Sequence, residues 1–246
     1  MTFARLAFGI SILVSSVPCH AGCREQLTTA LPDGGTILFG EVHGTTEIPR
    51  FFLDCVTESV GNNESIEVLL ELDTGENEKL KKFANGQISE TDLLQSPHLK
   101  KTDGRASIAM LSLVRALKDL QGGQIVARGF DARGADRDRA MMSNLVSLRG
   151  AKRYSLVLTG NLHARLIRGV AWNTAFTPFA THLRDHGEHV ISLNVHYTEG
   201  TAWTCSPDCG ITTLSPPAKK GYCLKGSASS CDQTIRLTPD FFRLAR

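Results

Sequence analysis

The chain has 246 residues, of which 41% are hydrophobic and 21% charged, so it holds enough apolar material for one sizeable core. Its formal net charge is +2, from 27 basic and 25 acidic residues that are scattered along the chain. This balance argues against nucleic acid or an anionic membrane surface as a partner.

The first 21 residues are predicted to be a secretory signal peptide. Arg5 supplies the positive charge, residues 6–17 form an apolar core of suitable length, and Ala21 offers a small residue for cleavage. No other run approaches the roughly 20 apolar residues of a membrane span. We therefore expect an exported protein, periplasmic or extracellular. A lipoprotein anchored through Cys23 is the alternative.

Cysteine usage is consistent with export. Removing Cys19 with the signal peptide leaves six of the seven cysteines (7 − 1 = 6), an even number suited to disulfide bonds. A bridge between Cys23 and Cys55 would tie the mature N-terminus to the first helix, and the last four cysteines would pair among themselves in an undetermined order. A zinc site is the alternative for those four, although their spacing suits it poorly. The candidates are Cys23, Cys55, Cys205, Cys209, Cys223 and Cys231.

The first predicted elements are a buried strand at 36–39 and a helix at 48–60. Between them, Glu41 and His43 lie in a tight turn beyond the carboxyl end of the strand, where open α/β sheets bind ligands. A histidine can carry a proton near neutral pH, and a nearby carboxylate can fix its tautomer and raise its basicity. This turn is the strongest candidate for a functional site.

A second strand is predicted at 66–72, with Glu71 near its end. An unpaired carboxylate in such an apolar run would be unfavourable, which makes Glu71 a functional candidate. The polar stretch 76–104, with two short helices, is interpreted as an insertion able to form a lid. A helix follows at 107–120 because its apolar residues repeat with helical spacing.

The remaining predicted elements alternate in type. They are strands at 124–130, 154–159 and 189–195 and helices at 135–148 and 178–185. The resulting order β-α-β-α-α-β-α-β-α-β predicts a single α/β domain with a mostly parallel sheet flanked by helices, over residues 22–203. Residues 204–246 are predicted to be a cysteine-rich tail packed on the same domain.

Right-handed crossovers would bring the carboxyl ends of these strands to one edge of the sheet. The acids and imidazoles found there are Glu41, His43, Glu71, Asp131 and His163. Asp131 has an alternative role as an ion-pair partner of nearby arginines, which Asp136 and Asp138 can also pair with. Glu47 and Arg50 form either a solvent-exposed helix pair or substrate contacts. The predicted substrate-binding residues are Glu47, Arg50, Asp131 and Asn161.

Three groups of motifs together resemble one superfamily: Gly-Glu-x-His-Gly-x-x-Glu at 40–47, the strand-end Glu71, and Gly-Asn-Leu-His at 160–163. That superfamily contains erythromycin-esterase-like hydrolases, haem-binding uptake proteins of the ChaN type and Tiki (TraB-type) proteins. The first motif and the helix at 137–144 look most like the esterase branch, whereas 160–164 with Gly169 looks more like the haem-uptake branch. The resemblance covers roughly residues 35–200.

The resemblance implies an α/β fold in which both histidine turns and the glutamates form one pocket. His43 would be the general base that activates water, and Glu41 would orient it. Glu71 and His163 would position water or stabilise the oxyanion. In the Tiki-like branch the equivalent groups serve metal-dependent peptide cleavage, so His43, Glu41, Glu71 and His163 are also candidate ligands for Mn, Co or Zn.

Two functions of different classes follow. The first is an exported hydrolase of ester or amide bonds in a small-molecule or peptide substrate. The sequence contains no serine elbow, Walker loop or dinucleotide fingerprint, which argues against a serine-nucleophile hydrolase and against a nucleotide enzyme. The second is a haem or iron-compound binding protein of the uptake type without catalysis. The sequence leaves the oligomeric state open.

Overall fold

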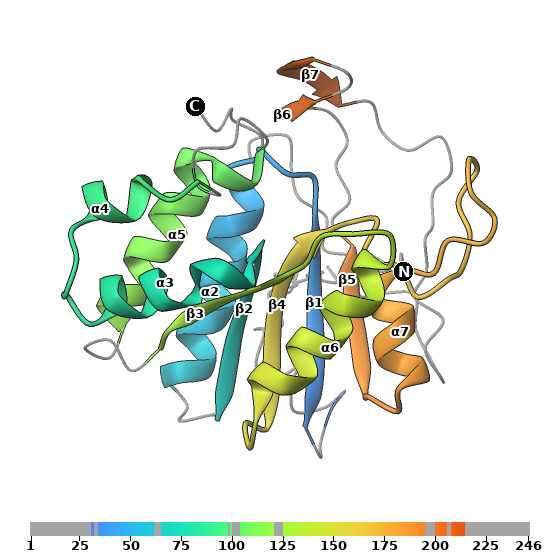
Figure 1. The fold of residues 1–246 in the computed structure, drawn as a ribbon, viewed down its shortest axis with the longest axis horizontal. Helices are drawn as coiled ribbons and strands as arrows, with labels where there is room; N and C mark the ends of the chain where they lie inside the picture. Colours follow the sequence, from blue (N-terminus) through green and yellow to red (C-terminus); the bar gives the residue numbers. More distant parts are fainter. Residues whose placement is uncertain are drawn as a thin grey trace, which may run out of the picture.

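The buried apolar segments pair into a central parallel sheet of five strands in the part of the chain that the structure describes (Figure 1). Their spatial order is β3-β2-β4-β1-β5. The strands are β1 (Gly35–Glu41), β2 (Ile66–Asp73), β3 (Ala127–Asp131), β4 (Tyr154–Gly160) and β5 (Val190–Asn194).

The structure is a computed structural model, and it describes residues 31, 34–61, 65–97, 99, 104–120, 125–194, 200–205 and 208–214. The predicted signal peptide and the cysteines at 23, 223 and 231 lie outside this part of the chain. Within it, no helix combines the length and the apolar character of a transmembrane segment.

Helices cover both faces of the sheet, which makes a three-layer α/β domain as predicted. The helices are α2 (Glu47–Gly61), α3 (Asn77–Ala84), α4 (Glu90–Leu94), α5 (Ile108–Asp119), α6 (Arg137–Arg149) and α7 (Phe179–Asp185). Two 3-10 turns, η1 (Thr74–Glu76) and η2 (Gly104–Ala106), lie in the connections.

Alternate residues of each strand face the two helical layers, as pleating requires. Ile37 and Phe39 of β1 belong to a core shared with α2, α3, α4 and α5, whereas Leu38 belongs to a core shared with α6 and α7. Each strand is therefore buried on both sides, which explains the nearly continuous apolar runs that identified the strands in the sequence.

The chain leaves neighbouring strands toward opposite faces. After β1 it passes through α2 in one layer to reach β2, whereas after β4 it passes through α7 in the other layer to reach β5. Because β4 lies between β1 and β2, the chain turns toward opposite layers after neighbouring strands at this edge, which is the position where such sheets bind ligands. The fold thus places the predicted site at this edge.

The structure corrects several predicted boundaries. Strand β1 continues to Glu41, because its ladder with β4 extends to the pair Glu41–Gly160, so Glu41 lies in the strand and not in the turn. The stretch predicted to be a lid is part of the main core, since Leu80, Phe83 and Leu93 are buried there. Their burial anchors α3 and α4 to the domain.

The segment expected to be an irregular tail begins as a β-hairpin. Strands β6 (Gly200–Cys205) and β7 (Cys209–Leu214) pair antiparallel, so β6 runs across the boundary we predicted after residue 203. The weak apolar pattern of these strands concealed them, because β7 is largely exposed.

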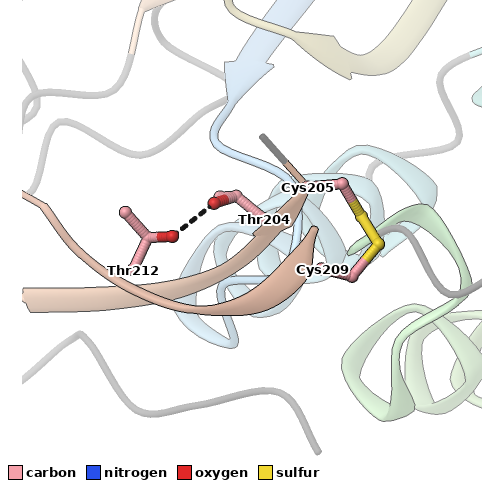
Figure 2. Close-up of a disulfide and its surroundings, with 4 residues drawn as sticks. All are labelled: Thr204, Cys205, Cys209 and Thr212. Atoms are coloured by element: carbon pink, nitrogen blue, oxygen red, sulfur yellow. Dashed lines mark hydrogen bonds between the residues drawn. A yellow bond between two sulfur atoms is a disulfide. The ribbon is translucent and has the colours of Figure 1, made fainter. Parts of the chain in front are cut away.

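A disulfide joins Cys205 to Cys209 at the end of this hairpin (Figure 2). The zinc alternative is therefore wrong for these two cysteines, whose sulfurs are bonded to each other. Cys55 is also disulfide-bonded, and because Cys23 lies outside the described residues, the pairing of these two stays a prediction. Disulfides point to an oxidising, exported compartment.

Candidate functional site

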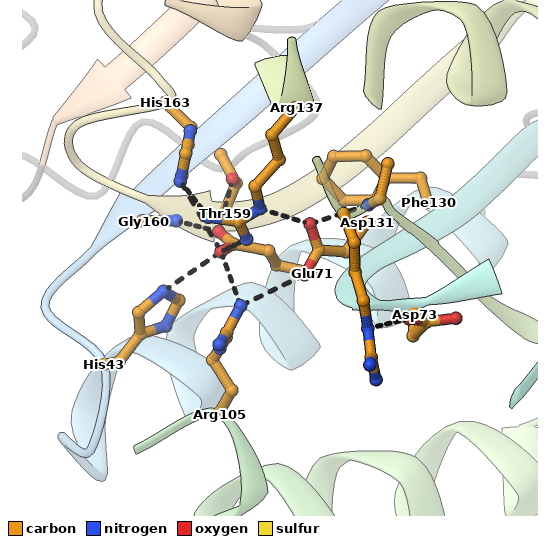
Figure 3. Close-up of polar contacts among 12 residues, drawn as sticks. His43, Glu71, Asp73, Arg105, Phe130, Asp131, Arg137, Thr159, Gly160 and His163 are labelled. Carbon is orange, nitrogen blue, oxygen red and sulfur yellow. Dashed lines mark hydrogen bonds and ion pairs between the residues drawn. The ribbon is translucent and has the colours of Figure 1, made fainter. Parts of the chain in front are cut away.

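The carboxyl ends of the strands bring together the acids and imidazoles predicted from the sequence. Glu41 ends β1. Glu71 lies near the end of β2 and Asp131 ends β3, while His43 and His163 follow β1 and β4 (Figure 3). Glu41, Glu71, Asp131 and His163 are all buried.

His43 is held by carboxylates at both ring nitrogens. Its Nδ1 lies 2.7 Å from Oε1 of Glu41, and its Nε2 lies 3.5 Å from Oε1 of Glu71. The side chain of His43 remains 26% exposed, whereas that of Glu41 is only 2% exposed. Glu41 thus fixes the orientation of the ring, while part of the His43 side chain remains accessible to solvent.

Glu71 is the centre of the polar network. One of its oxygens accepts hydrogen bonds from the hydroxyl of Thr159, at 2.8 Å, and from the backbone N–H of Gly160, at 2.7 Å. The other accepts from Arg137 Nη2 at 2.7 Å and lies 3.4 Å from Arg105 Nη1. Both oxygens of this buried carboxylate are therefore bound by hydrogen-bond donors.

Two arginines link Glu71 to Asp131. Arg137, at the start of α6, donates from Nε to Asp131 at 2.7 Å, and Arg105, in η2, donates from Nη1 to the other Asp131 oxygen at 3.0 Å. Asp131 therefore binds arginine, the structural alternative raised by the sequence, while still lying beside the candidate catalytic groups. The two guanidinium groups thus bring positive charge into the site.

His163 forms a second histidine–carboxylate pair. Its Nδ1 lies 2.7 Å from Asp138, and its Nε2 lies 3.0 Å from Arg137 Nη1. Because arginine only donates, Nε2 of His163 must accept and Nδ1 must carry the proton donated to Asp138. Asp138 does not pair with the neighbouring arginines as predicted, because it also accepts the backbone N–H of Phe179.

The electrostatics of His43 and Glu71 are coupled. Burial disfavours the charged form of His43, but the charge of Glu71 and the hydrogen bond to Glu41 outweigh it and raise the pKa of His43 from 6.5 to about 10. Burial likewise opposes ionisation of Glu71, but the charge and hydrogen bond of His43 and the charge of Arg137 hold the pKa of Glu71 well below its usual range. At neutral pH the resting pair is imidazolium and carboxylate.

Close backbone approach makes glycine necessary at the centre of the site. A Cβ on Gly160 would lie 2.9 Å from Nε2 of His43 and 3.5 Å from Oε2 of Glu71. A side chain there would therefore push into the ring of His43. The Gly-Asn-Leu-His motif thus supplies an open surface for the first histidine as well as the second histidine itself.

Three predicted substrate contacts lie outside this network. Glu47 is buried, not part of a solvent-exposed pair, and its carboxylate accepts the backbone N–H of Thr46 at 3.1 Å. Arg50 is exposed on α2. Asn161 donates its backbone N–H to the carbonyl of Glu41 at 2.8 Å, and its side-chain oxygen has no hydrogen-bond partner in the structure as described. Their roles toward substrate stay predictions.

The donor set does not fit a metal ion. Among the described residues, no group of three or more His, Cys, Asp or Glu side chains is arranged to hold one. Arg137 and Arg105 occupy the space between the carboxylates and already neutralise Glu71 and Asp131. A divalent cation would have to displace these guanidinium groups.

Sequence reasoning missed several members of the site. It did not identify Arg105, which directly follows the polar stretch 76–104, or Thr159, which is the last side chain of β4 before Gly160. Arg137 and Asp138 were interpreted only as members of structural ion pairs near Asp131, and the pair of Arg137 with Asp131 is present. Their position at the start of the helix that follows β3 was the available signal, because helix starts in α/β folds lie at the edge where ligands bind.

Solved structures share this fold at low sequence identity. A Bacillus cereus protein aligns with a TM-score of 0.61 and 9% identity over 82% of this chain and 76% of that one. A succinoglycan biosynthesis protein aligns with a TM-score of 0.63 and 10% identity over 79% and 74% of the two chains. ChaN of Campylobacter jejuni, which binds haem cofacially, aligns with a TM-score of 0.50 and 15% identity over 70% and 86%.

No protein-family model matches the chain, and no curated protein matches it significantly. The chain therefore shares its fold with ChaN, one branch of the resemblance noted in the sequence. At these identities the likeness concerns the fold alone, so function has to be argued from the site.

Proposed function

We propose that the chain is an exported hydrolase of ester or amide bonds in which His43 activates water. The observation that carries the proposal is the position of the imidazole. Glu41 orients it through Nδ1 at 2.7 Å, and its partly exposed ring lies at the carboxyl edge of the sheet. A histidine oriented by a buried carboxylate is the usual arrangement of a general base.

In the reaction, neutral His43 accepts a proton from water through Nε2 as the oxygen attacks the substrate carbonyl. The carbonyl π electrons move to oxygen and form a tetrahedral oxyanion. The guanidinium groups of Arg105 and Arg137 are suited to stabilise that charge. His43 then returns its proton to the departing alcohol or amine as the carbonyl re-forms.

The charges revise the roles implied by the resemblance. Glu71 is an anion and repels an oxyanion, so its role is to position Arg137 and His43, both of which it contacts. His163 accepts from Arg137 and so helps to aim that guanidinium group. The arginines, and not Glu71, would stabilise the oxyanion.

The raised pKa of His43 sets a condition on this mechanism. With a pKa of about 10, His43 is protonated in the resting site at neutral pH, and only the small neutral fraction can take a proton from water. The proposal therefore implies hydrolysis that becomes faster as the pH rises toward 10. A mechanism with His43 as the base needs no water bound to a metal ion.

The uptake-protein alternative is supported by a likeness of fold alone. The likeness to ChaN is one of fold and does not assign haem to this chain.

The test uses mature protein from residue 22, purified oxidised, with ester and peptide substrates before and after chelator treatment. We expect hydrolysis that survives the chelator and falls by about 10² to 10⁴-fold in His43→Gln, the range of general-base contributions. His186→Gln removes an exposed histidine outside the network and should keep full activity. Absence of turnover together with a stoichiometric Soret band on haem addition would overturn the proposal in favour of binding.

A further inference from the structure

The β6–β7 hairpin lies directly on the turn that carries His43. The backbone N–H of Trp203, in β6, donates to the carbonyl of Gly44 at 3.3 Å. Gly44 has a φ of 80°, and a Cβ there would collide with the backbone of Trp203. Backbone therefore packs on backbone at the residue that directly follows the histidine.

The 3-10 turn η2 also packs on the turn of His43. A Cβ on Gly104 would collide with the backbone of His43 and Gly44. Gly104 precedes Arg105, the arginine that binds Asp131. The turn of His43 is thus in contact with both the hairpin and the element that supplies an arginine of the site.

The hairpin is closed by a disulfide within reach of solvent. Cys205 and Cys209 are register partners at its end, both are exposed, and Cys205 is two residues from Trp203 (Figure 2). Cys55, which is disulfide-bonded elsewhere, is completely buried in the core. A soluble reductant therefore meets the hairpin disulfide first.

We propose that the β6–β7 hairpin positions His43 for hydrolysis and that its Cys205–Cys209 disulfide makes this positioning dependent on redox state. This inference rests on the proposed function, because it concerns regulation of the same site. With the disulfide intact, the hairpin holds Trp203 against Gly44. With the disulfide reduced, the short exposed hairpin loosens and the turn of His43 loses one of the two surfaces that hold it.

The redox step requires a dithiol. One thiolate of the dithiol attacks a sulfur of the disulfide and breaks the S–S bond, and its second thiol resolves the mixed disulfide. Two electrons and two protons pass to Cys205 and Cys209, which become thiols, while the dithiol becomes a disulfide. A crosslink that closes so short a loop contributes little to global stability, so we expect the domain to stay folded.

The experiment treats the oxidised full mature chain with graded dithiothreitol and identifies the reduced cysteines by alkylation and mass spectrometry. Once Cys205 and Cys209 are free and Cys55 is still bonded, we expect kcat/KM for ester hydrolysis to fall about tenfold, as for a small displacement of a catalytic group. The pKa of His43, read by NMR of its imidazole, should fall from about 10 toward 6.5. Reoxidation should restore both values.

Matched variants separate the possible outcomes. The double variant C205S/C209S should show the reduced rate and no response to dithiol, whereas Thr212→Ala, which removes the hydrogen bond to Thr204 in the same hairpin, should behave as wild type. Unchanged rate and unchanged His43 pKa with both thiols free would overturn the inference. If the oxidised chain hydrolyses nothing, the proposed function fails, while the NMR titration still decides whether the hairpin positions His43.

Discussion

The two histidines of the site are held by similar carboxylate pairs but differ in what their Nε2 atoms face. Nε2 of His43 lies 3.5 Å from the carboxylate of Glu71, whereas Nε2 of His163 accepts a hydrogen bond from Arg137 at 3.0 Å. Because Arg137 engages Nε2 of His163, we expect proton transfer at His43 and positioning at His163.

Glu71 should contribute more to stability than any acid on the surface. Glu71→Gln removes the negative charge that Arg137 and His43 face in a buried position, and we expect a loss of about 3–5 kcal/mol in the free energy of unfolding, measured in urea at pH 7. The matched control is Glu78→Gln, whose exposed partner is Lys82 and which should change stability by less than about 0.5 kcal/mol.

The pH dependence of that difference has a definite sign. The pKa of Glu71 is lowered in the folded protein, so its contribution is present above its ordinary value of 4.5 and disappears as the pH falls through the folded value. The difference in the free energy of unfolding between wild type and Glu71→Gln should therefore become smaller as the pH falls into the acid range. A difference that does not change with pH would contradict an ionised Glu71 in the network.

At the scale of elements, the site depends on how closely β4 approaches the turn after β1. Gly160→Ala places a methyl group 2.9 Å from Nε2 of His43, a contact that the ring can relieve only by moving. We expect a fall in kcat/KM of at least about tenfold with a smaller effect on unfolding. Kinetics and thermal unfolding of the same preparation measure both.

The control for this change is Gly61→Ala at the end of α2, where a Cβ meets no atom within 4 Å. It should keep full activity and leave stability equal or slightly higher, because alanine reduces the freedom of the unfolded chain. Full activity in Gly160→Ala would show that the ring of His43 does not need its present position.

At the scale of the molecule, the sequence was sufficient for the sheet and for half of the site. Buried strands have nearly continuous apolar runs, and acids or histidines that end such runs must meet at one edge, which identified Glu41, Glu71 and Asp131. Their partners were harder to find. Arg105 comes from a polar connection, and nothing local distinguishes it from solvent-exposed arginines.

The hairpin was missed for a similar reason. Strands β6 and β7 bury few side chains, Ala202 and Leu214 among them, so their sequence lacks a periodic signal. Their contact with Gly44 is made by backbone, which no side-chain pattern reports. The fold places this hairpin where it matters most, beside the turn of His43.

The pH dependence of ester hydrolysis by wild type and Glu41→Gln is the most direct test of His43 as the base. We predict that kcat/KM of the wild type rises about tenfold per pH unit and levels near the His43 pKa of about 10. Glu41→Gln should level at a lower pH, because it removes a carboxylate that raises this pKa. A rate independent of pH between 7 and 10, or an identical profile in the two proteins, would contradict catalysis by His43.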